Sequence, residues 1–523
     1  MKTDKDLYHQ LRVLSSEKLW NDEVAQFDRA TPEERIKRVA VIRAVGVVFS
    51  ESGTAKQKAE VRSWLVRLLQ DPSEKVRRYA MTALPKLGAG PKEEGVLLSL
   101  LRRTTVEREK KFLGQALDKI GGTATLSVVA GVRGFPPQTE QKVKAKVART
   151  ERPSVIRMDS LLSEFTRLRI HLHCRKGLEE IARDELKAYI AKHEKFRIVE
   201  VRSGLLAITP VAPFSLADLY TLRCFITVGF FLGHVRGSNP AESVDALASV
   251  ITSPLSQSVL ATFTQGSIRY RLEFVSKGHQ RGMVRLLADR AYAMCPDILN
   301  DPRSAPWSMD LFPTGRGISV ELRPKLTPDP RFTYRQEDVR AASHPPLAAS
   351  MARLGGSVNH EIVWDPFCGS GLELIERALL GGVQSIFGTD LSPDAIAISR
   401  TNFAAARVKG VQVKFTCCDF RDYAKVEGLG PESVTLLITN PPMGRRIRVP
   451  NLRGLFGDLF DAAAAVLKPG GRLVFANPLR IEPLDPSLKL KYRKVIDLGG
   501  FNCRLEMYLK LEGRRLRSPH STS

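Results

Sequence analysis

The chain has 523 residues and a formal net charge of +24, from 80 Lys and Arg against 56 Asp and Glu. This length predicts two or three domains that each bury a core, and the charge favours a polyanionic partner over an acidic or neutral one. The seven cysteines form no CxxC pair, and no stretch has the length of a signal peptide or membrane span. We therefore expect a reduced, cytoplasmic protein without a zinc site or membrane anchor.

Residues 1–150 show apolar positions at helical spacing and an internal repeat. The clearest unit is Asp71–Gly88, and a shift along the chain aligns its Ala83 and Leu87 with Ala116 and Ile120. The pattern resembles HEAT repeats, which are helix pairs that stack into a solenoid. Its basic positions are Arg77, Arg78, Arg102, Arg103, Lys110 and Lys111. They could contact an RNA backbone or form a solvated helix face, and the sequence leaves both interpretations open.

The middle of the chain mixes strand and helix patterns. A polar, proline-containing stretch indicates a linker over 151–165. Arg169–Leu186 has the pattern of a strand, a glycine turn and a helix, and residues 166–232 form one predicted module. Residues 233–325 form the next, with predicted strands at Ile268–Phe274 and Gly317–Arg323. A basic loop with Lys277 and Arg281 lies between those strands.

From about residue 340, apolar strands alternate with helices, which predicts an α/β sheet. The first strand, Glu361–Asp365, runs into a glycine-rich turn and the helix Leu372–Leu380. Its glycines, Gly369 and Gly371, do not have GxGxxG spacing, so a dinucleotide fingerprint fits poorly. Later strands end at Asp390, Asp419 and Asn440, and a fifth covers Gly471–Asn477 after the helix Leu452–Leu467.

Polar residues thus stand at the carboxyl ends of four successive strands, where open α/β sheets bind ligands. An acid at the second strand suits ribose hydroxyls, and Asp419 is placed to accept from an adenine amino group. The fourth strand ends in Asn440-Pro-Pro-Met443. The Asn440 side-chain oxygen and the Pro441 carbonyl would accept from an amine and place its nitrogen in line with a sulfonium methyl. A single such acid is often only a helix cap, but all four together favour methyl transfer to nitrogen.

The combination resembles the Rossmann-like S-adenosylmethionine-dependent methyltransferases over about residues 340–512. The segment before the sheet, Asp329–Arg335 followed by Ser343-His344-Pro345, narrows the resemblance. It looks like the lead-in of the THUMP-containing RNA methyltransferases, which make N2-methylguanosine in tRNA and rRNA. One departure is Met443, because the family usually has an aromatic residue there that stacks on the flipped base.

The resemblance implies a multidomain protein that binds S-adenosyl-L-methionine. Its expected parts are HEAT-like repeats (1–150), a ferredoxin-like module (166–232), a THUMP-like region (233–325), a Rossmann-like methyltransferase (326–512) and a disordered tail (513–523). It implies catalytic roles for Asn440, Pro441, Pro442 and Met443. Cofactor contacts are expected from His344, Pro345, Asp365, Phe367, Cys368, Gly369, Gly371, Asp390, Leu391, Asp419, Phe420 and Asn440. Substrate contacts are expected from Arg331, Tyr334, Arg335, Arg445, Arg446, Lys277 and Arg281.

We therefore expect an enzyme that methylates guanosine N2 in tRNA or rRNA. Methylation of adenine N6 or of a protein glutamine amide would keep the same chemistry on another substrate. A non-catalytic RNA-binding scaffold is the third interpretation, and the intact set Asp365, Asp390, Asp419 and Asn440 argues against it. A protein partner for the N-terminal repeats also remains open.

Overall fold

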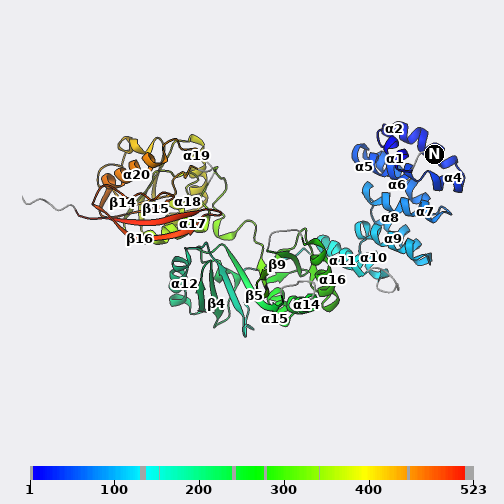
Figure 1. The fold of residues 1–523 in the computed structure, drawn as a ribbon, viewed down its shortest axis with the longest axis horizontal. Coiled ribbons are helices and arrows are strands. Elements are labelled where there is room, and N and C mark those ends of the chain that lie inside the picture. Colours follow the sequence, from blue (N-terminus) through cyan, green and yellow to red (C-terminus); the bar gives the residue numbers. More distant parts are fainter. Residues whose placement is uncertain are drawn as a thin grey trace, which may run out of the picture. The chain divides into compact units, whose positions relative to one another are not determined.

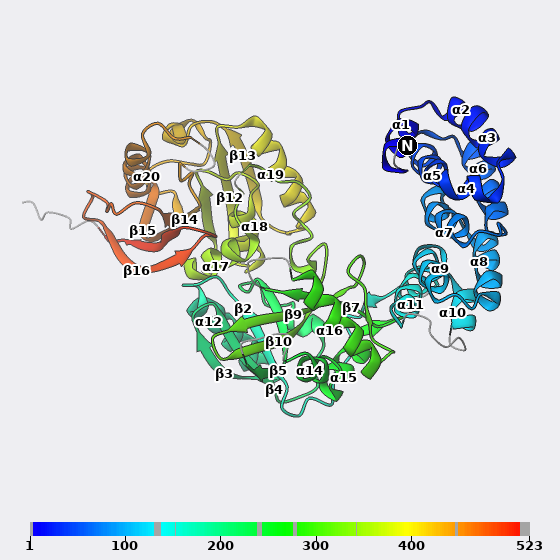
Figure 2. The ribbon, with the colours of Figure 1, turned by 45° about the vertical axis from the view of Figure 1, so that its right-hand side comes forward.

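The computed structural model of the chain describes residues 4–129, 137–151, 153–237, 243–275, 280–340, 342–444 and 448–512. The chain forms two compact units (Figure 1, Figure 2). Unit 1 combines Met1–Val155 with Val235–Ile318, and unit 2 combines Ile156–His234 with Ser319–Ser523. Both units are discontinuous in sequence, so contacts within each unit join segments that we predicted as separate modules. The expected tail, 513–523, lies outside the described residues.

The first part of unit 1 is helical. Its helices are α1 (Asp4–Arg12), α2 (Ser16–Lys18), η1 (Leu19–Val24), α3 (Ala25–Arg29), α4 (Pro32–Lys37), α5 (Ala40–Ser52), α6 (Ala55–Leu68), α7 (Glu74–Ala83), η2 (Leu84–Leu87), α8 (Pro91–Arg103), α9 (Glu107–Ile120), α10 (Thr123–Val129) and α11 (Pro137–Glu151). Thr31 and Thr54 begin α4 and α6 with reciprocal capping boxes. Helices α5, α7, α9 and α11 pack against one another in succession, and α6, α8 and α10 lie beside that row. The helical part of the prediction is therefore confirmed.

Ion pairs with buried carboxylates connect neighbouring segments of this helical part. The Arg35 guanidinium contacts Asp71 at 2.9 Å, and Arg77 contacts Glu109 at 2.6 Å. Arg78 is buried beside Glu74. Arg77 therefore joins α7 to α9, whereas the ion pair of Arg78 lies within α7 and its guanidinium packs over the Phe112 ring of α9. These contacts occupy both guanidinium groups and argue against the interpretation that they contact an RNA backbone. Arg102, Arg103 and Lys111 are exposed.

The second part of unit 1 combines helices with a small sheet. It contains β1 (Val155–Ile156), α14 (Val244–Ile251), α15 (Pro254–Phe263), β6 (Thr264–Gln265), β7 (Arg269–Phe274), α16 (Arg281–Met294), β8 (Leu299–Asn300) and β9 (Trp307–Thr314). Strand β7 lies between β8 and β9 and is parallel to both. Helix α11 packs onto this part, where Arg149 contacts Asp301 at 3.0 Å. One described stretch, Val244–Phe263, is long and apolar enough to cross a membrane by length and composition, although 44% of it is buried and it forms two helices here.

Unit 2 begins with an α+β module. It contains β2 (Arg169–His173), α12 (Glu179–His193), β3 (Phe196–Arg202), β4 (Leu205–Pro210), α13 (Leu216–Leu219), β5 (Thr227–Arg236) and β10 (Gly317–Pro324). The strands follow the order β3-β4-β2-β5-β10, and β2 is antiparallel to β4 and β5. The chain turns between β3 and β4 at Gly204, whose φ of +76° favours glycine.

The C-terminal part of unit 2 is a seven-stranded sheet of order β13-β12-β11-β14-β15-β17-β16. Its elements are η3 (Pro330–Phe332), α17 (Pro345–Gly355), β11 (Glu361–Asp365), α18 (Leu372–Leu379), β12 (Val383–Asp390), α19 (Pro393–Ala405), β13 (Gln412–Cys417), η4 (Phe420–Lys425), β14 (Val434–Thr439), α20 (Leu452–Val466), β15 (Leu467–Asn477), β16 (Leu488–Asp497) and β17 (Asn502–Lys510). The first five strands are parallel, and β17 is antiparallel to both β15 and β16. The chain leaves β11 to one side for β12 and β13 and to the other for β14. This reversal opens a crevice at the carboxyl ends of β11 and β14, where such sheets bind ligands.

Candidate active site

A cavity of about 1210 Å³ lies at the carboxyl ends of β11, β12, β13 and β14. It brings together most of the residues that we expected in the cofactor and amine sites. Those that line it are Arg335, His344, Phe367, Cys368, Gly369, Asp390, Leu391, Asp419, Phe420, Asn440, Pro441, Pro442 and Met443. The alternating strand pattern therefore places residues far apart in sequence around one space.

The glycine-rich turn after β11 shapes one wall of this cavity. Gly369 and Gly371 have φ values of +52° and +80°, which side chains of L residues rarely adopt. The Gly369 N–H donates to Asp390 Oδ2 at 3.0 Å, so the turn is fixed to the end of β12. Asp390 Oδ1 accepts from the Ser392 N–H at 2.9 Å. The Asp390 carboxylate thus borders the cavity in a fixed orientation.

Two buried acids lie behind this turn. Asp365 is fully buried and accepts from the Phe367 N–H at 3.0 Å. Its Oδ2 makes no hydrogen bond of standard geometry within the described part of the chain. Burial, followed by the charge of Glu373, raises the pKa of Asp365 well above its ordinary value, although the nearby Thr439 hydroxyl opposes this. Burial also raises the pKa of Glu373, which lines the cavity. The site therefore holds two carboxyl groups that a bound cation would stabilise in their charged forms.

Asp419 and two phenylalanines form another wall. The Asp419 carboxylate accepts from the Arg421 N–H at 2.9 Å and contacts its guanidinium at 2.9 Å. The rings of Phe367 and Phe420 lie 4.8 Å apart at an interplanar angle of 53°. These apolar rings beside a fixed acid suit a planar heterocycle with a donor group.

Asn440 directly follows β14, and only the NH2 group of its side-chain amide has a described hydrogen-bond partner. Its Nδ2 donates to Ser343 Oγ at 2.8 Å. Its Oδ1 has no hydrogen-bond partner among the residues that the structure describes. Pro441, Pro442 and Met443 line the cavity next to it. An acceptor without a partner in a partly buried wall is suited to a ligand N–H group.

His344 precedes α17 and is mostly buried. Burial lowers the pKa of His344 to about 4, and the nearby Arg175, Arg335 and Arg331 add to the effect. Its Nδ1 has no partner among the described side chains and backbone groups. A neutral imidazole therefore borders the cavity at neutral pH.

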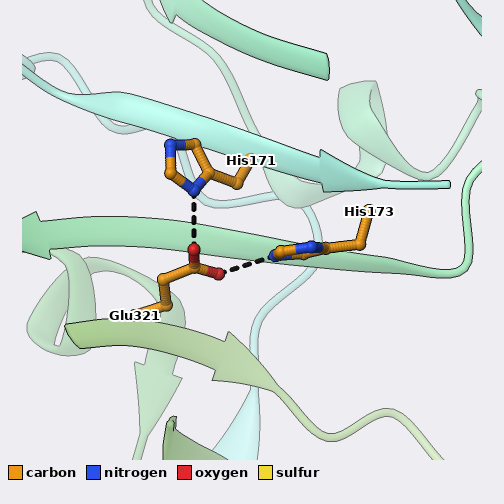
Figure 3. A group of neighbouring side chains, drawn as sticks. All are labelled: His171, His173 and Glu321. Carbon is orange, nitrogen blue, oxygen red and sulfur yellow. Dashed lines mark hydrogen bonds and ion pairs between the residues drawn. The ribbon is translucent and has the colours of Figure 1, made fainter. Parts of the chain in front are cut away.

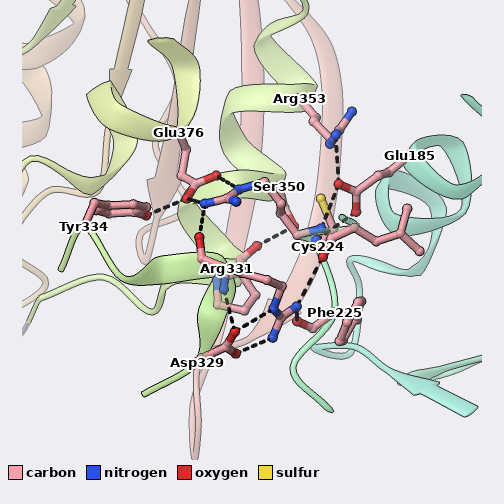
Figure 4. A network of polar contacts seen from close by, with 12 residues as sticks. Glu185, Cys224, Phe225, Asp329, Arg331, Tyr334, Ser350, Arg353 and Glu376 are labelled. Carbon is pink, nitrogen blue, oxygen red and sulfur yellow. Dashed lines mark hydrogen bonds and ion pairs between the residues drawn. The ribbon is translucent and has the colours of Figure 1, made fainter. Parts of the chain in front are cut away.

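Two expected RNA contacts belong instead to a buried network (Figure 4). Arg331 donates to the carbonyls of Phe225 at 2.8 Å and Ile226 at 3.2 Å, and contacts Asp329 at 2.7 Å. Tyr334 donates to Glu376. Arg331 is 5% exposed and Tyr334 is 4% exposed. The expectation that these two bind substrate is wrong, because their polar groups are already satisfied inside unit 2.

The network fastens the α+β module to the sheet within unit 2. Arg223 contacts Glu376 of α18 at 2.7 Å, and Arg353 of α17 contacts Glu185 of α12 at 2.8 Å. Gly177 lies so close to β16 that an added Cβ would be 2.1 Å from the Val495 carbonyl oxygen. These contacts bring Arg175 into the cavity wall.

The remaining expected residues lie elsewhere. Pro345 and Gly371 flank the cavity residues in sequence but do not line the cavity, and Asp365 lies behind its wall. Arg281 is exposed at the start of α16 in unit 1. Lys277, Arg445 and Arg446 lie outside the described residues.

Sequence reasoning missed several cavity residues, of which Glu373 is the most informative. It is 4% exposed and lies on α18 among Leu372, Leu374 and Ile375. An acid among apolar neighbours in the first turn of a helix that follows a glycine-rich turn is a signal that could have identified it. Arg175 and Phe501 come from segments distant in sequence, and no local pattern marks them.

A second polar cluster in unit 2 lies on the sheet of the α+β module (Figure 3). The Glu321 carboxylate lies between His171 Nδ1, at 2.6 Å, and His173 Nε2, at 2.7 Å. Their candidate ligand atoms all lie within 4.8 Å of one another. Tetrahedral zinc, with bonds of about 2.0–2.1 Å, separates its ligand atoms by roughly 3.3 Å. The shorter nitrogen–oxygen distances favour hydrogen bonds over metal ligation.

Comparison with known proteins gives one family model, which matches the C-terminal part, and several similar methyltransferases. Residues 333–485 match the family model described as UPF0020: RMKL-like, methyltransferase domain. The tRNA (guanine(6)-N2)-methyltransferase of Thermus thermophilus is 30% identical over 203 residues, which are 38% of this chain and 58% of that protein. The tRNA (guanine(10)-N2)-dimethyltransferase of Methanocaldococcus jannaschii is 31% identical over 157 residues, 30% of this chain and 43% of that protein. The chain thus spans less than two thirds of either relative.

A solved structure shares the fold over a longer range. The crystal structure of TrmN from Thermus thermophilus matches 66% of this chain and 100% of that chain, with a TM-score of 0.52 and 21% identity. This similarity shows a common fold. The α/β methyltransferase-like architecture expected for the C-terminal part is therefore confirmed.

Proposed function

We propose that this chain transfers a methyl group from S-adenosylmethionine to the N2 amino group of a guanosine in tRNA or rRNA. The observation that carries the proposal is Asn440, whose Oδ1 has no partner among the described residues and borders the cavity beside Pro441 and Pro442. The names of both relatives, which specify guanine N2 in tRNA, support this choice of nitrogen and substrate.

The cavity fits the cofactor on its own chemistry. Asp365 and Glu373 are buried acids with raised pKa values, so a ligand with a cationic amino group would restore their charged forms. The Asp390 carboxylate is fixed by two N–H groups and retains lone pairs for hydroxyl groups. Phe367 and Phe420 supply apolar surface for a base, with Asp419 beside them. When bound, S-adenosylmethionine would supply an electrophilic methyl group: the N–CH3 bond forms as the S–CH3 bond breaks, S-adenosylhomocysteine is the leaving group, and the nitrogen gives up one proton to solvent.

The contribution of the protein is then mainly positioning. An exocyclic amine is a weak nucleophile because its lone pair is delocalised into the ring. Acceptance of its N–H groups by Asn440 Oδ1 and the Pro441 carbonyl orients the nitrogen and favours the geometry that it adopts during transfer. Met443 lines the same wall and offers a flexible, polarizable contact to the base.

Unit 1 offers a basic surface for the remainder of the RNA. A cavity of about 1270 Å³ between α11, α16 and β7 has more basic than acidic side chains on its wall. The basic ones are Lys119, Lys142, Lys146, Arg149, Arg271, Arg281, Arg285 and Arg303. We propose that this THUMP-like region and the HEAT-like helices neutralise phosphates, while the sheet receives one extruded base. A protein partner for the helices and a cytoplasmic location remain part of the proposal, and the seven free cysteines support a reducing compartment.

The test is methylation of tRNA and rRNA by the purified full chain with isotope-labelled S-adenosylmethionine, followed by mass spectrometry of the nucleosides. We expect label in N2-methylguanosine. Asn440→Ala should keep cofactor affinity and lower the transfer rate by about 100-fold, by analogy with loss of one oxyanion-hole donor. The same substitution at Asn359 on the chain segment before β11 is the control.

Other products would identify the alternatives. Label in N6-methyladenosine or in protein glutamine would keep the chemistry and reject the guanosine assignment. Tight RNA and cofactor binding without transfer to any substrate would favour the scaffold interpretation.

A further inference from the structure

We infer that Ser343 and Glu373 orient the Asn440 amide so that its oxygen, and not its NH2 group, faces the substrate. This inference rests on the proposed function and assigns two positioning residues to the same site. Both line the cavity with Asn440. The three residues lie far apart in sequence: Ser343 precedes α17, Glu373 lies on α18 and Asn440 follows β14.

The three side chains form a directed chain of hydrogen bonds. Asn440 Nδ2 donates to Ser343 Oγ at 2.8 Å, and the Ser343 hydroxyl donates to Glu373 Oε1. A serine hydroxyl has one hydrogen and two acceptor lone pairs. An ionised Glu373 can only accept, so it takes that hydrogen, and Ser343 Oγ then accepts from Asn440. Glu373, the last acceptor in this series of hydrogen bonds, therefore determines that Ser343 binds the NH2 group of the Asn440 amide and not its oxygen.

The reverse orientation of Asn440 is disfavoured on both sides. Rotation of the amide by half a turn would place Oδ1 against Ser343 Oγ, whose hydrogen points to Glu373, so two acceptors would face each other. The NH2 group would then face an amine that also donates. The observed orientation instead leaves Oδ1 without a described partner at the cavity. The pair Ser343 and Glu373 thus makes the site an acceptor, which selects substrates that present N–H groups.

Ser343→Ala is the cleaner perturbation, because Glu373 also lies near Asp365 and its removal would change cofactor affinity. Without the hydroxyl, the Asn440 amide is free to adopt both orientations. Loss of a hydrogen bond that biases them corresponds to a fall in kcat of about 10-fold. S-adenosylmethionine affinity and the unfolding temperature should remain close to wild type. Ser343→Thr, which keeps a hydroxyl, should recover most of the rate.

The Asn440→Asp background distinguishes a positioning role of Ser343 from a merely structural one. A carboxylate presents an acceptor to the substrate in either orientation, so orientation no longer matters. Ser343→Ala should therefore cost about 10-fold in the wild-type background and less than about 2-fold in the Asn440→Asp background. Ser385→Ala, on β12 away from the cavity, is the matched control. Its hydroxyl donates to Gln412, and it should leave kcat unchanged in both backgrounds.

Glu373→Gln and Glu373→Leu test the role of Glu373 as the final hydrogen-bond acceptor. The glutamine carbonyl can still accept from Ser343, so Glu373→Gln should retain more activity than Glu373→Leu at saturating cofactor. Equal effects of Ser343→Ala in the two Asn440 backgrounds would overturn the inference, as would equal kcat values for the two Glu373 variants. Absence of methyl transfer to RNA by the wild-type chain would instead overturn the proposed function.

Discussion

Arg331 offers a direct test of whether the segment before the sheet supports the fold or contacts RNA. Its guanidinium donates to the carbonyls of Phe225 and Ile226 and pairs with Asp329. It also lies 4.0 Å from the centre of the Phe225 ring. The side chain is 1% exposed, whereas that of Asp329 is 33% exposed. Arg331→Ala therefore removes a buried cation and leaves two backbone carbonyls of unit 2 without their donor.

The magnitude follows from the partners that are left behind. Two carbonyls lose a charged donor, at about 1–3 kcal/mol for each buried group without a partner. Asp329 is exposed enough to regain water, so its contribution is small. A loss of about 3 kcal/mol is expected, near the lower end for a broken buried pair. At roughly 2–4 °C per kcal/mol for a unit of this size, the unfolding temperature should fall by roughly 6–12 °C.

Differential scanning calorimetry of the full chain measures this change, and Arg480→Ala, at an exposed arginine, is the control. Arg331→Lys should give a smaller decrease, since an ammonium group keeps the charge but cannot reproduce the planar set of donors. RNA affinity of the folded variant should be unchanged at a temperature well below its transition. Wild-type stability together with a large loss of RNA affinity would refute the structural role.

Three further outcomes follow from the charges of the two units. Burial and Glu373 raise the pKa of Asp365 in the free protein, so binding of a cationic cofactor should release a proton and tighten as pH rises towards that pKa. Calorimetry in two buffers of different ionisation enthalpy measures the release, and Asp365→Asn should reduce it, since the pKa of Glu373 is also raised. Burial disfavours the ionised form of Glu321, but the hydrogen bonds from His171 and His173 outweigh burial and lower the pKa of Glu321 to about 2. Its contribution to stability should therefore be complete above the ordinary pKa of about 4.5 and fade as pH falls towards 2, so the difference in unfolding free energy between wild type and Glu321→Gln should shrink over that range. In unit 1, Arg281→Ala and Lys142→Ala should each weaken RNA binding and reduce the salt slope of log K by about 1 for each phosphate that is no longer neutralised, as measured by fluorescence anisotropy; an unchanged slope would exclude this surface.

The sequence predicted the C-terminal sheet well because its signals are local. Each parallel strand is a short apolar run, and each ends in a polar residue or a glycine turn that ordinary pattern rules detect. The predicted strand Val434–Thr439 and helix Leu372–Leu380 agree with β14 and α18 to within one residue. The antiparallel pair β16 and β17 was missed, because its alternation is interrupted by charged residues such as Arg493 and Lys494 that pair across the sheet or to α12.

The errors in the site have a different cause. Arg331 and Tyr334 belong to a motif that precedes the sheet, and a basic or aromatic residue in such a motif suggests a ligand contact. Only the three-dimensional packing shows that backbone carbonyls and Glu376 occupy their polar groups. A sequence gives residue types but not the partners that satisfy them, so buried charges are the residues whose roles it predicts least well.

Glu373 shows the converse of this limit. A buried acid is costly unless its charge or its polar atoms have a partner, so its presence among the apolar side chains of the first turn of α18 requires a compensating interaction. Here the Ser343 hydroxyl supplies one, and a cationic ligand would supply another. The same carboxyl group would then serve two purposes, since its charge favours the cofactor and its hydrogen bond sets the direction of the Asn440 amide. A bound cation would favour the ionised acid, which can only accept from Ser343, so cofactor binding would also favour the orientation of the Asn440 amide that accepts from the substrate.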